Sequence, residues 1–485
     1  MDEIHKMKRR QFTGIFLMEM WERFAFYSFN ALFVLFAVAN YFTEAKAYMV
    51  FGIFTALVFG LPVIGGVVAD KIFGIKRSLT LGVFVLIAGY IVLALAHNLH
   101  VVYFALALIV VGESLFKPNP SALIGMIYKD NSSEGQSAFT YYYMAINIGA
   151  FVAPITAPII AHYFDFGGAF WVAAGGMMFA FGHYYSKRML YKDINNKADG
   201  RNLKFSNLLI TIIIIILLVI ASYYMLSFSN IAFFIILILS VIVYLYLAIS
   251  AFTVKERFGT IKQLVGVLLF IMGVVWFISY NQMFSTLILF ADHNVNMTWF
   301  GIHISPASFP ALDSFWILVL GPFLAKIYMK MDSGPHKTYM FEKFTIGMLL
   351  CTIAYVILIW ACTNFAHNGY IAGEWMLVYY FFAAFGELLV SALGLAVAAQ
   401  YFPKHRISLC MGAWLLATGC SSAISGKLAD LAALPKTVTN AVTSLPAYTN
   451  YFYILFYICL ISFIIFLIIS ILLRMLAKRK KIDFA

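Results

Sequence analysis

Charged residues are scarce in this sequence. Asp, Glu, Lys and Arg together make up 11% of the 485 residues, whereas 63% are hydrophobic. Soluble domains carry about 25% charged residues, and apolar runs long enough to cross a bilayer recur along this whole chain. The scarcity of charge therefore argues against an ordinary soluble protein and indicates a polytopic membrane protein.

Metal-binding and catalytic patterns are also missing. The cysteines all fall in expected helices without metal-ligand spacing, and the histidines form no HExxH or similar cluster. No nucleophile, base and orienting residue stand in a recognisable arrangement. We therefore expect buried free thiols, no metal, no cofactor and no enzymatic activity. The cysteines are Cys351, Cys362, Cys410, Cys420 and Cys459.

Lysine and arginine are nearly absent from every second loop. The loops on that side hold only Lys46 and Lys436, while the N-terminal "KMKRR" and the C-terminal "KRKK" fall on the other side. This is the positive-inside bias, so both termini are expected in the cytoplasm and the net charge of +12 reflects topology, not nucleic-acid binding. No cleavable signal peptide is expected, because the basic N-terminus leads directly into a helix that is too long for one.

Long apolar stretches occur fourteen times along the chain, and a spanning helix needs about 20 apolar residues. They predict an all-α polytopic membrane protein with 14 transmembrane helices. The predicted spans lie at approximately 12–36, 47–69, 78–97, 101–128, 137–163, 169–186, 205–227, 230–252, 263–291, 313–331, 344–363, 373–402, 407–431 and 450–474.

The spans fall into groups of six, two and six. A polar, charged segment follows the sixth span, and the next two spans contain no charge, which suits a lipid-exposed hairpin. This pattern predicts a transporter built from two bundles around a central cavity. The predicted parts are an N-terminal six-helix bundle at 1–188, a linker with two extra spans at 189–258, and a C-terminal six-helix bundle at 259–485.

The loop after the second span reads "GGVVADKIFGIKR". Its small residues let the helix pack closely against a neighbour, and its basic residues hold the loop on the cytoplasmic side. The order of glycine, aspartate with a basic residue, glycine and two basic residues resembles the signature loop of the major facilitator superfamily. The resemblance implies a major facilitator fold and a gating or structural role for Asp70 and Arg77.

The first span carries three ionisable residues, Glu19, Glu22 and Arg23. Each costs about 2.5 to 3.5 kcal/mol near the bilayer centre, so they are expected to face protein or water. Glu19, Arg23 and Tyr27 recur every fourth residue, and Glu22 and Asn30 lie on the adjoining row. One face of this helix therefore carries all of its polarity.

The fourth span also carries ionisable residues, in the segment "GESLFKPNPSAL". Glu113 and Lys117 are again four residues apart, and Pro118 and Pro120 weaken the helix after them. An internal ion pair that stabilises helix packing would explain the charges of one span. Charges in two spans favour a functional site.

Several motifs together resemble the proton-dependent oligopeptide transporter (POT/PTR) family, in the form of bacterial di- and tripeptide permeases. "EMWERFAFY" is similar to the family's first-helix signature and "FKPN" to its fourth-helix lysine motif. "YYMAINIGAF", "GELLVSALGL" and "MGAWLLATG" are similar to three later signatures. The resemblance covers almost the whole chain, and the pair of extra central helices is the bacterial form.

The resemblance implies a proton-coupled symporter that imports di- and tripeptides by alternating access. The expected partners are short peptides, protons and the lipid bilayer of a bacterial inner (plasma) membrane. The proton gradient would drive transport without a cofactor, nucleic acid would play no part, and we expect a functional monomer.

The resemblance also implies roles for individual residues. Arg23 and Lys117 would hold the peptide carboxylate, while Asn147 and Glu387 would hold its amino end. This agrees with the need of a zwitterion for cations and an anion on facing bundles. The two glutamates of the first span, Glu19 and Glu22, would take part in proton coupling and in ion pairing with Lys117.

Aromatic and polar residues near these motifs are candidates for the space around substrate side chains. Tyr27, Trp276 and Trp414 could line it, although packing is the commoner role in a chain with 18% aromatic residues. The chain departs from the family pattern at three positions, so its preference for side chains is expected to differ. These are Phe26 and Phe59 in place of tyrosines, and Asn30 at a first-helix position that is polar or basic in the family.

The carboxylate that carries the proton is left open. The family commonly has an acid where Asn281 stands and an asparagine where Asp313 stands, and both positions are also candidate substrate-binding residues. Glu113 is a further acid beside Lys117. Asp313 either carries the coupling proton, if its side chain lies close to Asn281, or caps the outer end of its helix, because it follows the polar "SPASFPAL" and precedes an apolar run.

Three other functions compete with peptide symport. The same fold could move another small carboxylate or amino compound, because fold does not determine substrate. A membrane sensor or scaffold would bind a ligand without transporting it, but no appended signalling domain is present to support that function. A membrane enzyme is the weakest alternative.

Overall fold

A computed structural model of the chain describes residues 2–129, 132–254, 256, 258–299, 301–332, 338–435, 438, 440–482 and 484. Within these residues, 13 helical segments are long and apolar enough to cross a membrane. One of them, α7 (Ser132–Ser186), has non-helical backbone at Phe164 and Asp165 and therefore holds two spans. The predicted 14 spans and the all-α class are confirmed.

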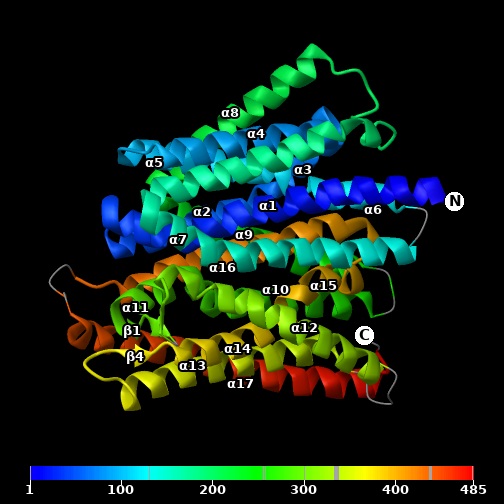
Figure 1. Cartoon of the computed structure of the whole chain (residues 1–485). Coiled ribbons are helices and arrows are strands. Elements are labelled where there is room, and N and C mark those ends of the chain that lie inside the picture. Colours follow the sequence, from blue (N-terminus) through cyan, green and yellow to red (C-terminus); the bar gives the residue numbers. More distant parts are fainter. Residues whose placement is uncertain are drawn as a thin grey trace. The chain divides into compact units, whose positions relative to one another are not determined.

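The first half of the chain contains nine labelled α-helices among the described residues (Figure 1). They are α1 (Asp2–Asn40), α2 (Glu44–Gly60), α3 (Pro62–Val67), α4 (Ile75–Ala94), α5 (Leu99–Phe116), α6 (Asn119–Ile127), α7, α8 (Phe205–Ser227) and α9 (Ser229–Ser250). A short π-helical segment, η1 (Val68–Phe73), joins α3 to the loop before α4.

The second half has eight more α-helices in the described part of the chain. They are α10 (Gly259–Tyr280), α11 (Thr286–Asn294), α12 (Ala311–Asp332), α13 (Met340–Asn364), α14 (Glu374–Val390), α15 (Gly394–Tyr401), α16 (Ile407–Leu428) and α17 (Ala441–Lys480). Two short strand pairs lie in the loops. β1 (Val295–Asn296) pairs in parallel with β4 (Ile371–Ala372), and β2 (Thr298–Trp299) pairs in antiparallel with β3 (Ile302–His303).

Four of the predicted spans are interrupted, and the second span breaks at Leu61 between α2 and α3. The fourth breaks between α5 and α6 at Lys117, where Pro118 follows and removes a backbone donor. The ninth breaks at the 3₁₀ turn η4 (Asn281–Phe284), and the twelfth at η6 (Ser391–Leu393). Interrupted helices leave backbone groups unpaired and mark binding regions in transporters.

The helices form two compact units. Unit 1 contains Met1–Tyr41 and Leu57–Ser229, and unit 2 contains Phe42–Ala56 and Asn230–Ala485. In unit 1, α1 packs along α7 and α4 along α5, while in unit 2 α13 packs against both α14 and α17.

The predicted linker segment, 189–258, is divided between the two units. α8 packs against α5 in unit 1. α9 belongs to unit 2, where the Tyr244 hydroxyl donates to the carbonyl of Ala413 and the Gln263 amide donates to the carbonyl of Leu247. The boundary between the units falls at the short turn between the two helices.

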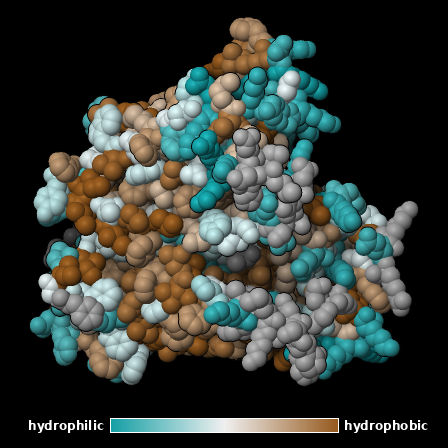
Figure 2. Space-filling view, turned by 45° about the vertical axis from the view of Figure 1, so that its right-hand side comes forward, coloured by the Kyte–Doolittle hydropathy of each residue, from teal (hydrophilic) through white to brown (hydrophobic). Residues whose placement is uncertain are grey.

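Large apolar side chains are exposed along α8 and α9, as expected for a lipid-facing hairpin. Examples are Ile216 and Leu217 on α8 and Ile238 and Ile242 on α9. Figure 2 shows broad hydrophobic areas on one face of the molecule, with hydrophilic side chains gathered mainly near its margins. The five cysteines are buried free thiols, as predicted.

The signature loop is held in unit 1 by the segment that follows α7. Asp70 is exposed in η1. The Arg77 guanidinium donates to the carbonyls of Ala198, Asp199 and Arg201, and the Asp199 carboxylate accepts from the first backbone N–H groups of α4. The structure therefore gives Arg77 a structural contact, whereas a gating role for Asp70 stays a prediction.

Candidate functional site

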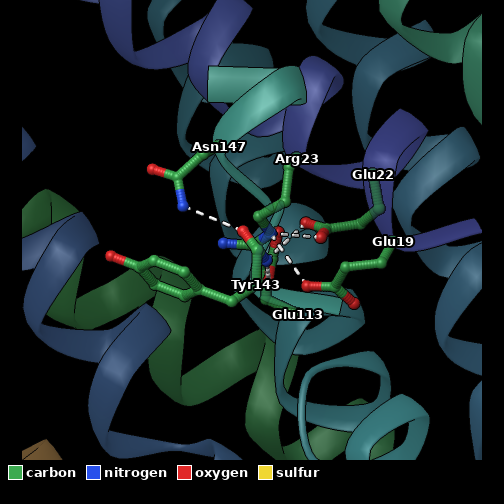
Figure 3. A network of polar contacts seen from close by, with 6 residues as sticks. All are labelled: Glu19, Glu22, Arg23, Glu113, Tyr143 and Asn147. Atoms are coloured by element: carbon green, nitrogen blue, oxygen red, sulfur yellow. Dashed lines mark hydrogen bonds and ion pairs between the residues drawn. The ribbon is translucent and has the colours of Figure 1, made fainter. Parts of the chain in front are cut away.

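The ionisable residues of the first and fourth spans meet in unit 1. We call Glu19, Glu22, Arg23, Glu113 and Lys117 the Arg23 cluster. Arg23 forms a two-pronged pair with Glu22 at 2.5 and 2.7 Å, and its nitrogens lie 3.2 Å from Glu113 and 3.4 Å from Glu19. Figure 3 shows the three carboxylates converging on this guanidinium. A fork of this kind is among the stronger ion pairs in proteins.

Close packing of α7 on α1 encloses the Arg23 cluster. A Cβ atom at Gly149 of α7 would come within 2.6 Å of the Met20 carbonyl and 2.8 Å of Arg23 Cβ, so only glycine allows this approach. Tyr142, two turns earlier on α7, interacts with Glu19. The motif "YYMAINIGAF" therefore serves first as a packing surface for the polar face of α1.

Lys117 lies at the break between α5 and α6. Its Nζ atom is buried and has no hydrogen-bond partner among the described residues. It lies 3.9 Å from the ring centre of Phe59 and 5.4 Å from that of Phe26. Aromatic faces attract a cation but offer no acceptor for its protons. Phe26 and Phe59, which replace tyrosines of the family pattern, therefore place apolar rings beside the ammonium.

The expected ion pairing of Glu19 and Glu22 with Lys117 is wrong for this structure. Both glutamates pair with Arg23 instead. The physical reason is the shape of the donor, because a guanidinium presents several donors in one plane and can bind several carboxylates. Helical periodicity showed that these residues share a face of the helix. It did not show which cation the two glutamates would pair with.

The remaining predicted residues of unit 1 lie beside the Arg23 cluster. Asn147 is buried, and its amide donates to the carbonyl of Tyr143 one turn earlier, pointing aside from Arg23 in Figure 3. Asn30 is buried and its Oδ1 has no hydrogen-bond partner in the described part of the chain. Tyr27 is half-buried and interacts electrostatically with Arg23. Their contacts with substrate stay predictions.

A second group of ionisable residues meets in unit 2. We call Tyr280, Asp313 and Glu387 the Tyr280 cluster; they come from α10, α12 and α14. The Tyr280 hydroxyl lies 3.0 Å from Asp313 Oδ2 and 2.5 Å from Glu387 Oε2. Asp313 is only 5% exposed, whereas Glu387 is half-buried. The more accessible acid is therefore Glu387.

Asp313 does not cap its helix. It lies in the first turn of α12, as the sequence indicated. However, its Oδ2 accepts from Tyr280, and its Oδ1 has no hydrogen-bond partner in the described residues. The capping interpretation is wrong because α10 places a hydroxyl beside the carboxylate, a contact that sequence spacing does not reveal.

The aromatic candidates of unit 2 are packed among other rings. Trp276 is 1% exposed, stacks on Tyr280 at 4.7 Å, and donates from Nε1 to the carbonyl of Gly347. Trp414 is buried against Phe270 and other rings. Packing, the commoner role for aromatic residues, accounts for the contacts of both tryptophans.

Asn281 lies next to Tyr280 in the chain but does not share its contacts. The Asn281 amide donates to the hydroxyls of Ser421 and Ser422 on α16, at 3.3 and 3.0 Å. It is therefore tied to α16, while Asp313 bonds to Tyr280. Tyr280 itself was missed by sequence reasoning, although its position four residues after Trp276 at the end of an apolar helix was a usable signal.

The two clusters offer different chemistry. The Arg23 cluster contains two cations and three carboxylates, and its lysine is free to bind an anion. The Tyr280 cluster contains two carboxyl groups, one buried and one half-buried, and suits an ammonium group. Among the described residues no three His, Cys, Asp or Glu side chains are grouped so as to hold a metal ion.

Comparison with known proteins identifies the family. The sequence model of the POT family matches residues 76–449, which is more than half of the chain. The chain belongs to the POT family. Dipeptide and tripeptide permease A of Proteus mirabilis is 36% identical over 445 residues, covering 91% of this chain and 90% of the permease. This POT protein is therefore a multi-pass membrane transporter and not an enzyme.

Solved structures of POT proteins share the fold. A structure described as tetrameric PepTSo2 matches with a TM-score of 0.86 at 32% identity, covering 97% of this chain and 99% of that one. A second, described as giving insights into substrate recognition in proton dependent oligopeptide transporters, matches with a TM-score of 0.84 at 33% identity over 97% and 100%. The predicted transporter fold is confirmed.

Proposed function

We propose that this POT protein is a symporter that imports di- and tripeptides together with protons. The observation that carries the proposal is the buried Lys117 ammonium, which lacks a hydrogen-bond partner among the described residues. Burying a cation without a hydrogen-bond acceptor costs free energy, and an anionic ligand that binds it removes this cost. The dipeptide and tripeptide permease with which the chain shares 36% identity supports a short peptide as that ligand.

The peptide carboxylate is assigned to Lys117, with Arg23 beside it. Arg23 is already bonded to three carboxylates, so it has less capacity for a further anion. The Lys117 ammonium contacts two aromatic rings and has no hydrogen-bond partner among the described residues, so it gains most from a carboxylate. Arg23 thus holds the glutamates in place, and Lys117 makes the direct contact.

The peptide ammonium is assigned to Glu387. It is half-buried and lies at the accessible side of the Tyr280 cluster. Asn147 stays a second candidate for this end, although its amide hydrogens are partly used by the Tyr143 carbonyl. The carboxyl group that carries the proton is Glu19, Glu22, Glu113, Glu387 or Asp313.

The setting of the proposed transporter follows the sequence. We place it in a bacterial inner membrane with both termini in the cytoplasm, driven by the proton gradient without a cofactor. A functional monomer is proposed. Because PepTSo2 is described as tetrameric, light scattering of the purified protein combined with uptake by single-copy proteoliposomes is the appropriate test of this point.

Uptake of labelled dialanine into proteoliposomes tests the function. We expect accumulation above the external concentration with an inward proton gradient and only equilibration without one. Protein-free liposomes provide the control. Accumulation that does not depend on the proton gradient would contradict proton coupling. Transport of acetate or of single amino acids in preference to peptides would favour the alternative substrate class, another small carboxylate or amino compound.

Alternating access can be tested by labelling surface cysteines. The native cysteines are all buried, so background labelling should be low. Lys71 in η1 and His405 in a short 3₁₀ turn are exposed positions of the two units. We expect the labelling rates of Lys71→Cys and His405→Cys to change when dialanine saturates the protein. Rates that do not respond to substrate would argue for a static sensor or scaffold.

A further inference from the structure

One hydroxyl group joins two acids in the Tyr280 cluster. The hydroxyl lies within hydrogen-bond distance of both Asp313 and Glu387, and the two carboxyl groups also interact directly. Neither carboxyl group caps a helix. The three groups come from three helices that are separated in the sequence. Local structure therefore does not explain why they lie in contact.

No cation balances the two acids within the described residues. The ion pairs found there join Lys8, Arg23, Lys427 and Arg474 to acids other than Asp313 and Glu387. The titratable groups that face Asp313 are Tyr280 from α10 and Glu387, Tyr379 and Tyr380 from α14. Two ionised carboxylates in such surroundings repel each other strongly, and a proton on one of them removes the repulsion.

The hydrogen bonds require the same proton. An ionised carboxylate only accepts, and a tyrosine hydroxyl has one hydrogen to donate. Tyr280 can therefore donate to one of the two acids but must accept from the other. Only a protonated carboxyl group can donate to it, so both short contacts are satisfied when the pair holds one proton.

Burial indicates which acid holds it. Asp313 is the more buried of the two acids, and a charge is costlier there than on the half-buried Glu387. This difference places the proton on Asp313 and the charge on Glu387.

We propose that Asp313 carries a transported proton. In the loaded protein Asp313 is a neutral acid that donates to Tyr280, Tyr280 donates to Glu387, and Glu387 stays ionised to hold the peptide ammonium. Loading forms one O–H bond on Asp313 with a proton from the outer medium, and release to the inside breaks that bond. The assignment rests on the proposed function, because a transported proton presupposes proton-coupled transport.

The variant Asp313→Asn separates proton binding from proton release. The amide can still donate to Tyr280, but it cannot give up a proton. In proteoliposomes we expect dialanine counterflow, which needs no net proton movement, to stay within about twofold of wild type. Accumulation driven by an inward proton gradient, and acidification of a trapped pH dye during dialanine entry, should both be lost.

Infrared spectroscopy of the purified protein supplies a readout that needs no substrate. We expect a protonated carboxylic acid C=O band at neutral pH that disappears in Asp313→Asn. Asp430→Asn is the matched control, because Asp430 forms an ion pair with Lys427 at a partly exposed site in the same unit. This control should keep the band, counterflow and accumulation.

Two results would overturn the proposal. One is gradient-driven accumulation by Asp313→Asn at the wild-type level. The other is an infrared band that persists in a folded Asp313→Asn protein, whatever its transport. Failure of wild-type protein to take up dialanine would instead contradict the proposed function, and the infrared measurement would still decide whether Asp313 holds a proton.

Discussion

The two clusters solve the problem of buried charge in different ways. In the Arg23 cluster three glutamates surround one guanidinium at 2.5 to 3.4 Å, with a lysine nearby. In the Tyr280 cluster two acids share a neutral hydroxyl, with no cation paired to them among the described residues. The first cluster is neutralised mainly by side chains, and the second needs a proton.

This difference separates the tasks that the residues can perform. Carboxylates held by a guanidinium have a fixed cation beside them that balances part of their charge. A carboxyl pair without a cation binds a proton readily. The Arg23 cluster is therefore suited to present a fixed cation to the substrate, and the Tyr280 cluster is suited to titrate.

The largest expected effects come from removing the two cations of unit 1. Lys117→Ala should weaken peptide binding roughly 10- to 100-fold, since a hydrogen bond to a charged group contributes about 1.5 to 3 kcal/mol. Its thermal stability should change little, because no hydrogen bond of Lys117 to the described protein is lost. Uptake per folded protein and thermal unfolding measure the two effects.

Arg23→Ala should abolish most uptake and also lower stability. It leaves three buried carboxylates without their main partner, and breaking a buried ion pair costs about 3 to 5 kcal/mol. The protein should still insert into the membrane, with a lower unfolding temperature than Lys117→Ala. Equal stability of the two variants would remove the distinction between a supporting arginine and a binding lysine.

A smaller and more selective effect is expected in the Tyr280 cluster. Glu387→Gln should reduce affinity for dialanine by about tenfold, because a charge-assisted contact with the ammonium becomes a neutral one. N-acetyl-dialanine lacks the ammonium and should be affected much less. Competition against labelled dialanine measures both affinities, and equal losses would show that Glu387 does not contact the amino end.

The packing that encloses the Arg23 cluster can be tested with two glycines of α7. Gly149→Ala would place a Cβ atom 2.6 Å from the Met20 carbonyl and should cost about 1 to 3 kcal/mol of stability through overpacking. Gly175→Ala is the control, since nothing lies within 4 Å of its added Cβ. Thermal unfolding compares them, and equal values would mean that α7 need not approach α1 so closely.

The smallest effect is expected away from both clusters. Asp199→Ala removes the carboxylate that accepts from the N–H groups of Ile75 and Lys76 and should cost about 1 kcal/mol. Asp193→Ala changes an exposed acid of the same segment and should be neutral. Uptake of both should stay close to wild type. A large loss of uptake in Asp199→Ala would show that this segment does more than support α4.

Much of the architecture was already contained in the sequence. The number of spans and the lipid-facing hairpin follow from the length and composition of apolar segments, because a bilayer imposes both locally. The break after Lys117 could also be expected from Pro118 and Pro120. The interruptions at Asn281 and Ser391 carry no proline and were not anticipated, since tertiary packing selects them.

The same division holds for the candidate site. The sequence alone identified the buried ionisable residues, because each is too costly in an apolar helix to be accidental. Only the tertiary structure decided their partners: Arg23 takes the glutamates, Lys117 faces the rings of Phe26 and Phe59, and Tyr280 joins Asp313 to Glu387. Helical periodicity says which side chains share a face. The choice of partner depends on neighbouring helices that are distant in the chain, such as α10, α12 and α14.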